Sequence, residues 1–205
     1  MTTEAAASPA RGLLVSMRPK QWIKNLLVLA VPLASGQIGS ASVVGYTLLA
    51  FVSFCAASSA VYLTNDVLDR EADLNHPTKR SRPIAAGTVP VLVAAGTAAL
   101  LAVVALGAPL ALGSPDLSLL LLAYLLLQAV YVFWAKHQPV LDLASVAAGF
   151  VLRAIAGGVA SGIPISTWFL TVTAASAMFV VAGKRYSELV THGHEAETRR
   201  GLREY

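Results

Sequence analysis

The chain has 205 residues, of which 56% are apolar and only 13% are charged, about half of the charged share of a soluble domain. A water-soluble fold and an intrinsically disordered chain are therefore excluded. At this length the composition predicts an all-α polytopic membrane bundle of about six transmembrane helices, with no room for a separate soluble catalytic domain.

Small and polar residues dominate the N-terminus, and residues 1–16 are expected to be a disordered tail ahead of a transmembrane domain over 17–205. Basic residues between 11 and 24 then precede an apolar run at 26–38, which contains Pro32. This pattern resembles a signal peptide. Because more apolar runs follow, we interpret it as a short first membrane helix.

The other predicted spans are residues 43–64, 91–112, 117–135, 141–161 and 166–183. Every Lys and Arg except Arg153 lies in the N-terminal segment, in 65–90, in 136–140 or in the tail from residue 184. The connections at 39–42, 113–116 and 162–165 contain no Lys or Arg. The positive-inside rule therefore predicts a multi-pass protein of the cell inner membrane with both termini in the cytoplasm.

An acidic segment directly follows the second predicted span. If the helix continues, Asp66, Asp69 and Asp73 share one face, which Asn65 can join. Three carboxylates this close repel one another unless a cation lies between them. All-oxygen ligands suit Mg²⁺ that is also bound to substrate phosphates. The alternative is a solvated acidic helix end, the commoner meaning of an isolated D-x-x-D pattern.

A basic cluster lies a few residues further on, at Lys79, Arg80 and Arg82. Carboxylates that hold a metal and cations that hold phosphate oxygens are the two halves of a diphosphate site. Control of topology, or contact with anionic lipid, also explains these basic residues. Phosphate binding and these other uses of the basic residues are compatible. The presence of an acidic and a basic cluster in one loop favours a Mg²⁺-diphosphate site on the cytoplasmic side.

The acidic and basic motifs together read Asn65-Asp66-x-x-Asp69-x-x-x-Asp73, then His76-Pro77-x-Lys79-Arg80-x-Arg82-Pro83-Ile84-x-x-Gly87. This run resembles the signature of the UbiA superfamily of intramembrane prenyltransferases. Two further stretches, RPKQWIKN at 18–25 and GKRYSEL at 183–189, resemble its phosphoribosyltransferase branch. The resemblance covers residues 17–205 and implies a helical bundle, usually of nine spans, with a Mg²⁺-diphosphate site and a lateral opening to lipid.

The implied reaction transfers 5-phosphoribosyl from phosphoribosyl pyrophosphate to a polyprenyl (decaprenyl) phosphate, for cell-wall arabinan precursors. The resemblance makes Asp66, Asp69 and Asp73 the catalytic and metal-binding residues, with Glu188 as a further Mg²⁺ ligand. The expected substrate-binding residues are Lys20, Lys24, Asn65, Lys79, Arg80, Arg82, Tyr131, Lys136, Arg153, Lys184, Arg185 and Tyr186.

Some of these residues have a second interpretation. Tyr131 and Lys136 are equally explained by snorkelling to the interface, and Asp142 by capping a helix. Arg153, inside a predicted span, contacts either a ligand or the rest of the bundle. The nearby glycines, Gly149, Gly157 and Gly158, are interpreted as sites of close helix packing.

The chain departs from the superfamily pattern in two respects. A second acidic motif, Asp-x-x-x-Asp, is replaced here by Lys184-Arg185-Tyr186-Ser187-Glu188, which favours a phosphorylated sugar donor. Family members usually continue for three more spans, so we expect either that the sequence is truncated at its C-terminus or that a partner supplies the rest. Activity of these 205 residues alone is doubtful.

Two other functions remain open. One is a UbiA-type transfer from a prenyl diphosphate donor to an aromatic or other acceptor, and the other is a non-catalytic membrane subunit or inactive fragment. We expect the membrane and its lipids as partners and no nucleic acid. Homo-oligomerisation is left open.

Overall fold

The computed structural model describes residues 8–135 and 138–192, and this part is wholly helical. The elements are α1 (Pro9–Ser16), the 3₁₀ helix η1 (Pro19–Leu29), α2 (Ala30–Ala34), η2 (Gln37–Gly39), α3 (Ala41–Leu68), α4 (Arg70–Leu74), η3 (Lys79–Ser81), α5 (Val91–Ala111), α6 (Pro115–Phe133), α7 (Pro139–Ser161) and α8 (Thr167–His192).

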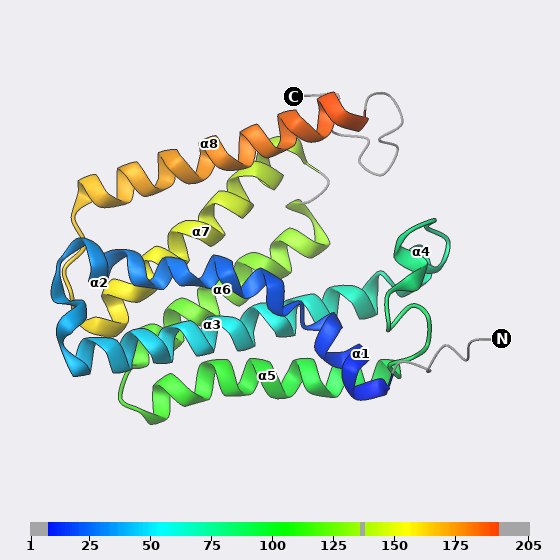
Figure 1. The fold of residues 1–205 in the computed structure, drawn as a ribbon, viewed down its shortest axis with the longest axis horizontal. Coiled ribbons are helices and arrows are strands. Elements are labelled where there is room, and N and C mark those ends of the chain that lie inside the picture. Colours follow the sequence, from blue (N-terminus) through cyan, green and yellow to red (C-terminus); the bar gives the residue numbers. More distant parts are fainter. Residues whose placement is uncertain (1–7, 136–137, 193–205) are drawn as a thin grey trace.

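Five of the described helices, α3, α5, α6, α7 and α8, are long and apolar enough to cross a bilayer. They form one bundle, with α8 along its outer side next to α7 (Figure 1). The prediction of an all-α polytopic bundle is confirmed.

The first predicted span, 26–38, is not a continuous membrane helix in the structure. The 3₁₀ helix η1 occupies its first part, α2 adds five residues, and the chain turns at η2. Gly157 of α7 lies directly against η1, because a Cβ built on it would meet the carbonyl oxygen of Val28 at 1.8 Å. Since so long a 3₁₀ segment is uncommon, this close packing explains it better than local sequence does, and it agrees with the packing interpretation of Gly157.

The expected disordered tail is wrong for residues 9–16, which form α1. The side-chain oxygen of Ser8 caps this helix by accepting the Arg11 N–H at 3.3 Å. Leu13 and Met17 pack against a buried cluster that consists of Leu63, Ile84, Val89, Ala94 and Ala98. This contact with distant residues is what the sequence did not reveal. Residues 1–7 lie outside the described part.

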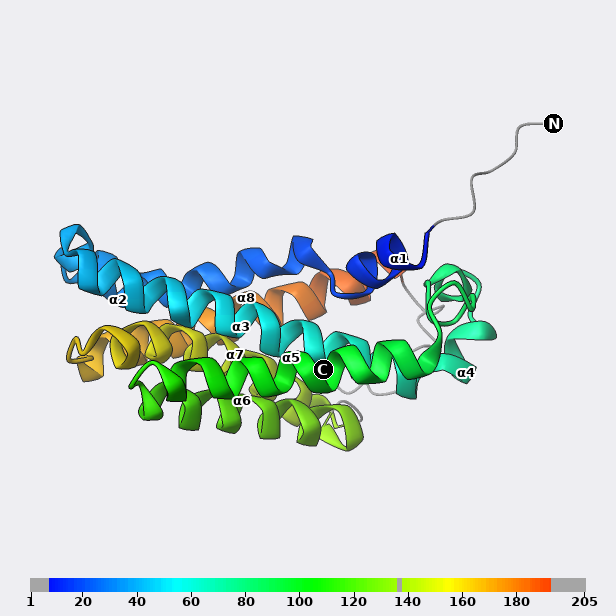
Figure 2. The ribbon, with the colours of Figure 1, turned by 90° about the horizontal axis from the view of Figure 1, so that it is seen from below.

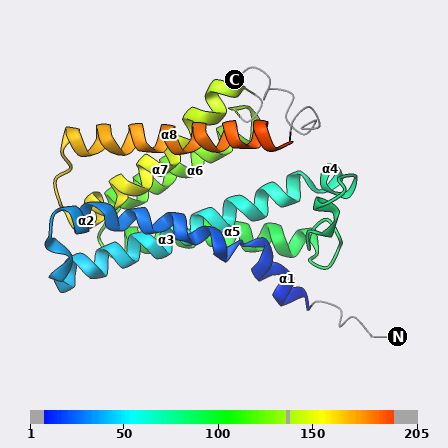
Figure 3. The same ribbon diagram turned by 45° about the horizontal axis from the view of Figure 1, so that its top comes forward.

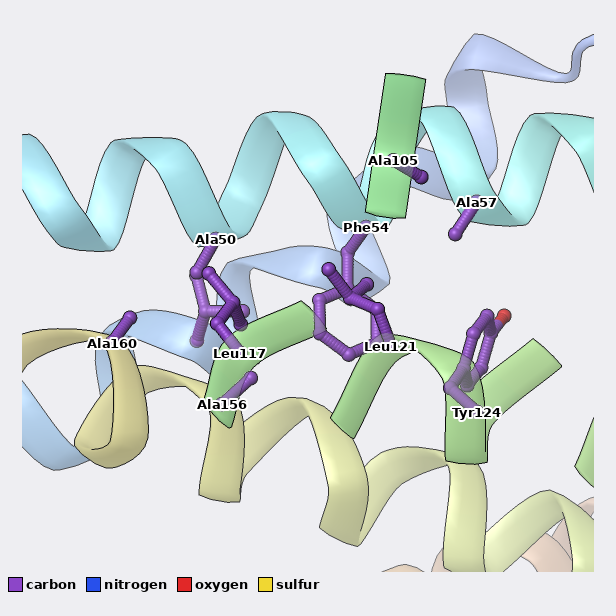
Figure 4. Packing of buried hydrophobic residues seen from close by; sticks show 10 residues of the cluster. Ala50, Phe54, Ala57, Ala105, Leu117, Leu121, Tyr124, Ala156 and Ala160 are labelled. Carbon is purple, nitrogen blue, oxygen red and sulfur yellow. The ribbon is translucent and has the colours of Figure 1, made fainter. Parts of the chain in front are cut away.

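The centre of the bundle is built from small and aromatic side chains. Figure 4 shows Phe54 and three α6 residues surrounded by alanines of α3, α5 and α7. The rings of Phe54 and Tyr124 meet edge to face, with centroids 5.2 Å apart. Small residues allow close approach of helices, which is the main source of packing energy where lipid is the solvent.

The connections sort to two opposite ends of the bundle. η2, the α5–α6 turn and the α7–α8 turn lie at one end, whereas α1 and α4 lie at the other (Figures 1 and 3). Seen from below, α4 and its loop project beyond the ends of the long helices (Figure 2). The acidic and basic motifs of the sequence therefore share one end of the bundle.

We predict that Gly157→Ala disrupts the fold, because its new methyl group would meet the backbone of η1. The expected loss is roughly 2–3 kcal/mol in the free energy of unfolding, measured by thermal unfolding in detergent micelles. Gly107→Ala in α5 is the matched control, because a Cβ there has no neighbour within 4 Å. Equal stability of the two variants would contradict the close approach of η1 and α7.

Candidate functional site

The acidic segment bends in the structure. Helix α3 ends at Leu68 and α4 begins at Arg70, with Asp69 as the junction between them. The supposed continuous helix is therefore wrong. Among the described residues, no three His, Cys, Asp or Glu side chains are grouped closely enough to hold a metal ion.

Two of the three carboxylates nevertheless converge on one cation. The Nη1 atom of Arg82 lies 3.2 Å from Oδ1 of Asp66 and 2.7 Å from Oδ2 of Asp73. Both aspartate side chains are buried, at 3% and 4% exposure, whereas the Arg82 side chain is 28% exposed. Buried carboxylates need such a partner, because leaving them ionised and unpaired is costly.

Arg18 is a site residue that the sequence analysis did not single out. Its Nη2 lies 2.6 Å from Oδ1 of Asp66, and its guanidinium stacks on the Tyr62 ring at 4.7 Å. It has left-handed backbone angles, φ 55° and ψ 59°, and is the only non-glycine residue with positive φ in the described part. Such a conformation costs roughly 1–2 kcal/mol and is held by its surroundings. Its position before Pro19 was the available signal, because proline disfavours right-handed helical geometry in the preceding residue.

The pair Asp66 and Asp73 suits Mg²⁺. A positively charged nitrogen already contacts both carboxylates, so their oxygens point toward a common cation position. Mg²⁺ usually takes one or two protein carboxylates and completes its shell with water and phosphate oxygens. Asp69 and Asn65 lie beside this pair, at the end of α3. The side chain of Glu188 lies outside the described part.

The other predicted phosphate-binding residues near the site belong to η3 and to η1. Arg80 and Lys20 are exposed, and Lys79 is half-buried. The ring of His76 accepts the backbone N–H groups of Thr78 and Lys79 on Nδ1, at 3.3 and 3.4 Å, which shapes the start of the basic loop. These residues are accessible to an anion from solution, and their role in substrate binding stays a prediction.

Lys24 lies among other cations, just before the apolar run at 26–38. Burial lowers the pKa of its ammonium group, and the nearby charges of Lys184, Arg153 and Arg18 lower that pKa further. An anionic group bound here would relieve this repulsion. The environment of Lys24 therefore favours a phosphate-binding role.

Arg153 is held by the bundle. Its Nε donates to Oδ1 of Asn25 at 2.8 Å, and its Nη2 donates to the Tyr124 hydroxyl at 2.9 Å. A third bond joins Nη1 to the carbonyl of Gly149, at 2.7 Å. All of these acceptors are neutral. Of the two interpretations of this arginine, the geometry favours stabilisation of the bundle, and Asn25 and Tyr124 are partners that the sequence did not identify.

A third polar cluster joins α6, α7 and α8. Asp142 is buried, and its Oδ1 accepts hydrogen bonds from the Tyr131 hydroxyl and from Nη2 of Arg185, both at 3.0 Å. The same Nη2 lies 2.8 Å from Oδ2 of Asp142. The interpretation of Asp142 as a helix cap is wrong, because α7 begins after Gln138 and Asp142 lies within it. Arg185 is correspondingly buried against α7, while Lys184 and Tyr186 are exposed. Lys136 lies outside the described part.

Comparison with known proteins gives one family. The sequence profile of the UbiA prenyltransferase family matches residues 26–194. A decaprenyl-phosphate phosphoribosyltransferase of Corynebacterium glutamicum is 48% identical over 96% of this chain and 60% of its own. One of Mycolicibacterium smegmatis is 49% identical over 95% of this chain and 62% of its own. The chain thus spans about three fifths of the length of these curated relatives.

The fold also matches a solved structure, that of a UbiA homolog from Archaeoglobus fulgidus bound to DMAPP and Mg²⁺. The TM-score is 0.70, with 22% sequence identity over 88% of this chain and 63% of the other. At this level of identity the match concerns the arrangement of helices.

We predict that Asn25→Leu destabilises the protein, because it removes the acceptor of Arg153 Nε and leaves a buried charged donor unsatisfied. The expected loss is about 2–3 kcal/mol in the free energy of unfolding, read from thermal unfolding in micelles. Asn75→Leu is the control, since Asn75 is exposed and should change stability by less than about 0.5 kcal/mol. Similar losses in both variants would argue against the Arg153 network.

Proposed function

The chain belongs to the UbiA prenyltransferase family, and we propose that it acts as a Mg²⁺-dependent transferase that moves 5-phosphoribosyl from phosphoribosyl pyrophosphate to a polyprenyl phosphate. The observation that carries this proposal is the convergence of Asp66 and Asp73 on one cation position, next to the basic loop and at one end of the membrane bundle. The names of the curated relatives give the transferred phosphoribosyl group and decaprenyl phosphate.

Binding of the donor requires both halves of the site. Asp66 and Asp73 would hold Mg²⁺, and the cations beside them would contact phosphate oxygens of the donor. A bound Mg²⁺ supplies electrostatic stabilisation of the charge that develops on the leaving diphosphate. Lys79, Arg80 and Lys20 serve as additional phosphate-binding groups.

In the transfer step, the bond between ribose C1 and the diphosphate oxygen breaks, and its electron pair leaves with the diphosphate. A new bond forms between C1 and a phosphate oxygen of the lipid. Since this oxygen is already anionic, the protein needs no general base. Lys24 holds the lipid phosphate at the membrane surface, with the isoprenoid chain in the apolar surroundings of the helices.

The cationic end of α8 supports a sugar-phosphate donor. Lys184 and Arg185 stand at the position of the second acidic motif of other family members. The exposed Lys184 binds an additional phosphate there, whereas Arg185 is buried and paired with Asp142. The protein lies in the cell inner membrane, and the distribution of Lys and Arg orients the end of the bundle that holds the site toward the cytoplasm.

We predict that Asp66→Asn lowers phosphoribosyl transfer by at least about a hundredfold, because it removes a carboxylate of the metal site. The assay uses membranes incubated with ribose-labelled phosphoribosyl pyrophosphate and polyprenyl phosphate, and it counts the label extracted with the lipid. Asp116→Asn is the matched control, since Asp116 is exposed at the opposite end of the bundle. Unchanged transfer by folded Asp66→Asn protein would refute the metal assignment.

The same assay separates the alternative functions. A prenyltransferase that uses a prenyl diphosphate donor would leave the sugar label in water and would instead transfer a labelled prenyl chain. A non-catalytic subunit would transfer neither label.

We predict that removal of divalent cations with EDTA stops the transfer and that added Mg²⁺ restores it, because Asp66 and Asp73 bind the donor through the metal. Activity is measured on the same membranes before chelation, after it and after readdition. Transfer that continues at its original rate in EDTA would contradict the proposed role of the two carboxylates.

A further inference from the structure

The cation position of the site is contacted by a protein side chain. Nη1 of Arg82 is within hydrogen-bond distance of both Asp66 and Asp73, so the guanidinium neutralises the two carboxylates together. A divalent ion bound between the same oxygens would lie within a few ångströms of this nitrogen. The two positive charges would repel strongly in so buried a place. Arg82 and a metal ion therefore cannot occupy the position at the same time.

Arg18 and Arg82 are attached to the site in different ways. Arg18 makes the shorter contact with Asp66, stacks on Tyr62 and is fixed by the backbone before Pro19. The hydrogen bonds of the Arg82 side chain in the described part go to the two carboxylates. Arg82 also follows the short helix η3 in the basic loop. The structure thus distinguishes an anchored arginine from one whose attachment depends on Asp66 and Asp73.

We propose that Arg82 is an exchangeable counter-ion, which neutralises Asp66 and Asp73 in the unliganded protein and transfers to the diphosphate when the donor and its metal ion bind. This inference rests on the proposed function and adds an order of events to it. Arg18 contacts Asp66 from outside the position that Arg82 occupies between Asp66 and Asp73, so it stays on Asp66 and acts as a positioning residue. Arg82 exchanges one anionic partner for another, so its charge is never left unpaired.

The exchange couples the metal to the diphosphate. A divalent ion that arrives alone must displace Arg82, which then has no anion to contact. A metal that arrives with a diphosphate brings the new partner with it. By linkage, each of the two raises the affinity of the protein for the other. The site therefore binds free metal weakly and the metal-diphosphate pair tightly.

The test measures binding of Mn²⁺, used as a probe for Mg²⁺, to the purified protein in detergent by equilibrium dialysis, without and with inorganic pyrophosphate. Arg82→Gln should bind Mn²⁺ alone about tenfold more tightly than the unaltered protein, because the competing charge is gone. Arg70→Gln is the matched control. Arg70 is exposed and adjoins the same acidic segment, so it reports the general effect of losing one positive charge.

If Arg82→Gln and Arg70→Gln bind Mn²⁺ with equal affinity, the exchange is overturned. The metal assignment would still stand in that case if pyrophosphate promotes Mn²⁺ binding. A lack of Mn²⁺ binding by every protein, with and without pyrophosphate, would overturn both the exchange and the proposed metal site. Arg82→Met serves if the glutamine variant does not fold. It also removes the charged nitrogen that contacts both carboxylates, so its affinity for Mn²⁺ alone should also exceed that of the unaltered protein, and no gain would refute the proposal.

Discussion

The site depends on the pairing of buried carboxylates with guanidinium groups. Asp66 and Asp73 are almost completely removed from solvent, and an ionised carboxylate in such a position is stable only beside a positive charge. Arg18 and Arg82 provide that charge from two other parts of the chain. The two arginines thus hold the carboxylates of the candidate metal site in position without a metal ion.

The rest of the fold brings these four residues together. Leu13 and Met17 attach the segment before Arg18 to the cluster around Leu63, while Ile84 and Val89 attach the basic loop to the same cluster. Both arginines therefore reach the end of α3 from segments that pack against the same apolar cluster. Deeper in the bundle, the Arg153 network and the close contact of η1 with Gly157 keep η1 against α7, which holds Lys24 near the same end.

Residues that the motifs grouped together have different roles in the structure. Arg185 and Arg153 were both expected to bind substrate, yet Arg185 pairs with Asp142 and Arg153 with neutral groups of η1, α6 and its own helix. Arg18 was not among the expected site residues, yet it makes the shortest contact to Asp66. Sequence spacing identifies the residue types that a diphosphate site needs, but pairing across elements decides which cations are already neutralised.

The sequence by itself determined the all-helical membrane fold, five of the long helices, the gathering of acidic and basic motifs at one end, and the family. These features follow from local composition and from residue types at short spacing, which do not require knowledge of distant contacts. The tertiary structure alone decided that α1 is ordered, that the first span is a 3₁₀ helix with a short α-helix, and that the chain bends at Asp69. It also decided that Arg82 joins Asp66 to Asp73. Each of these outcomes depends on packing or charge pairing between segments far apart in the chain, and no local pattern records which segments will meet.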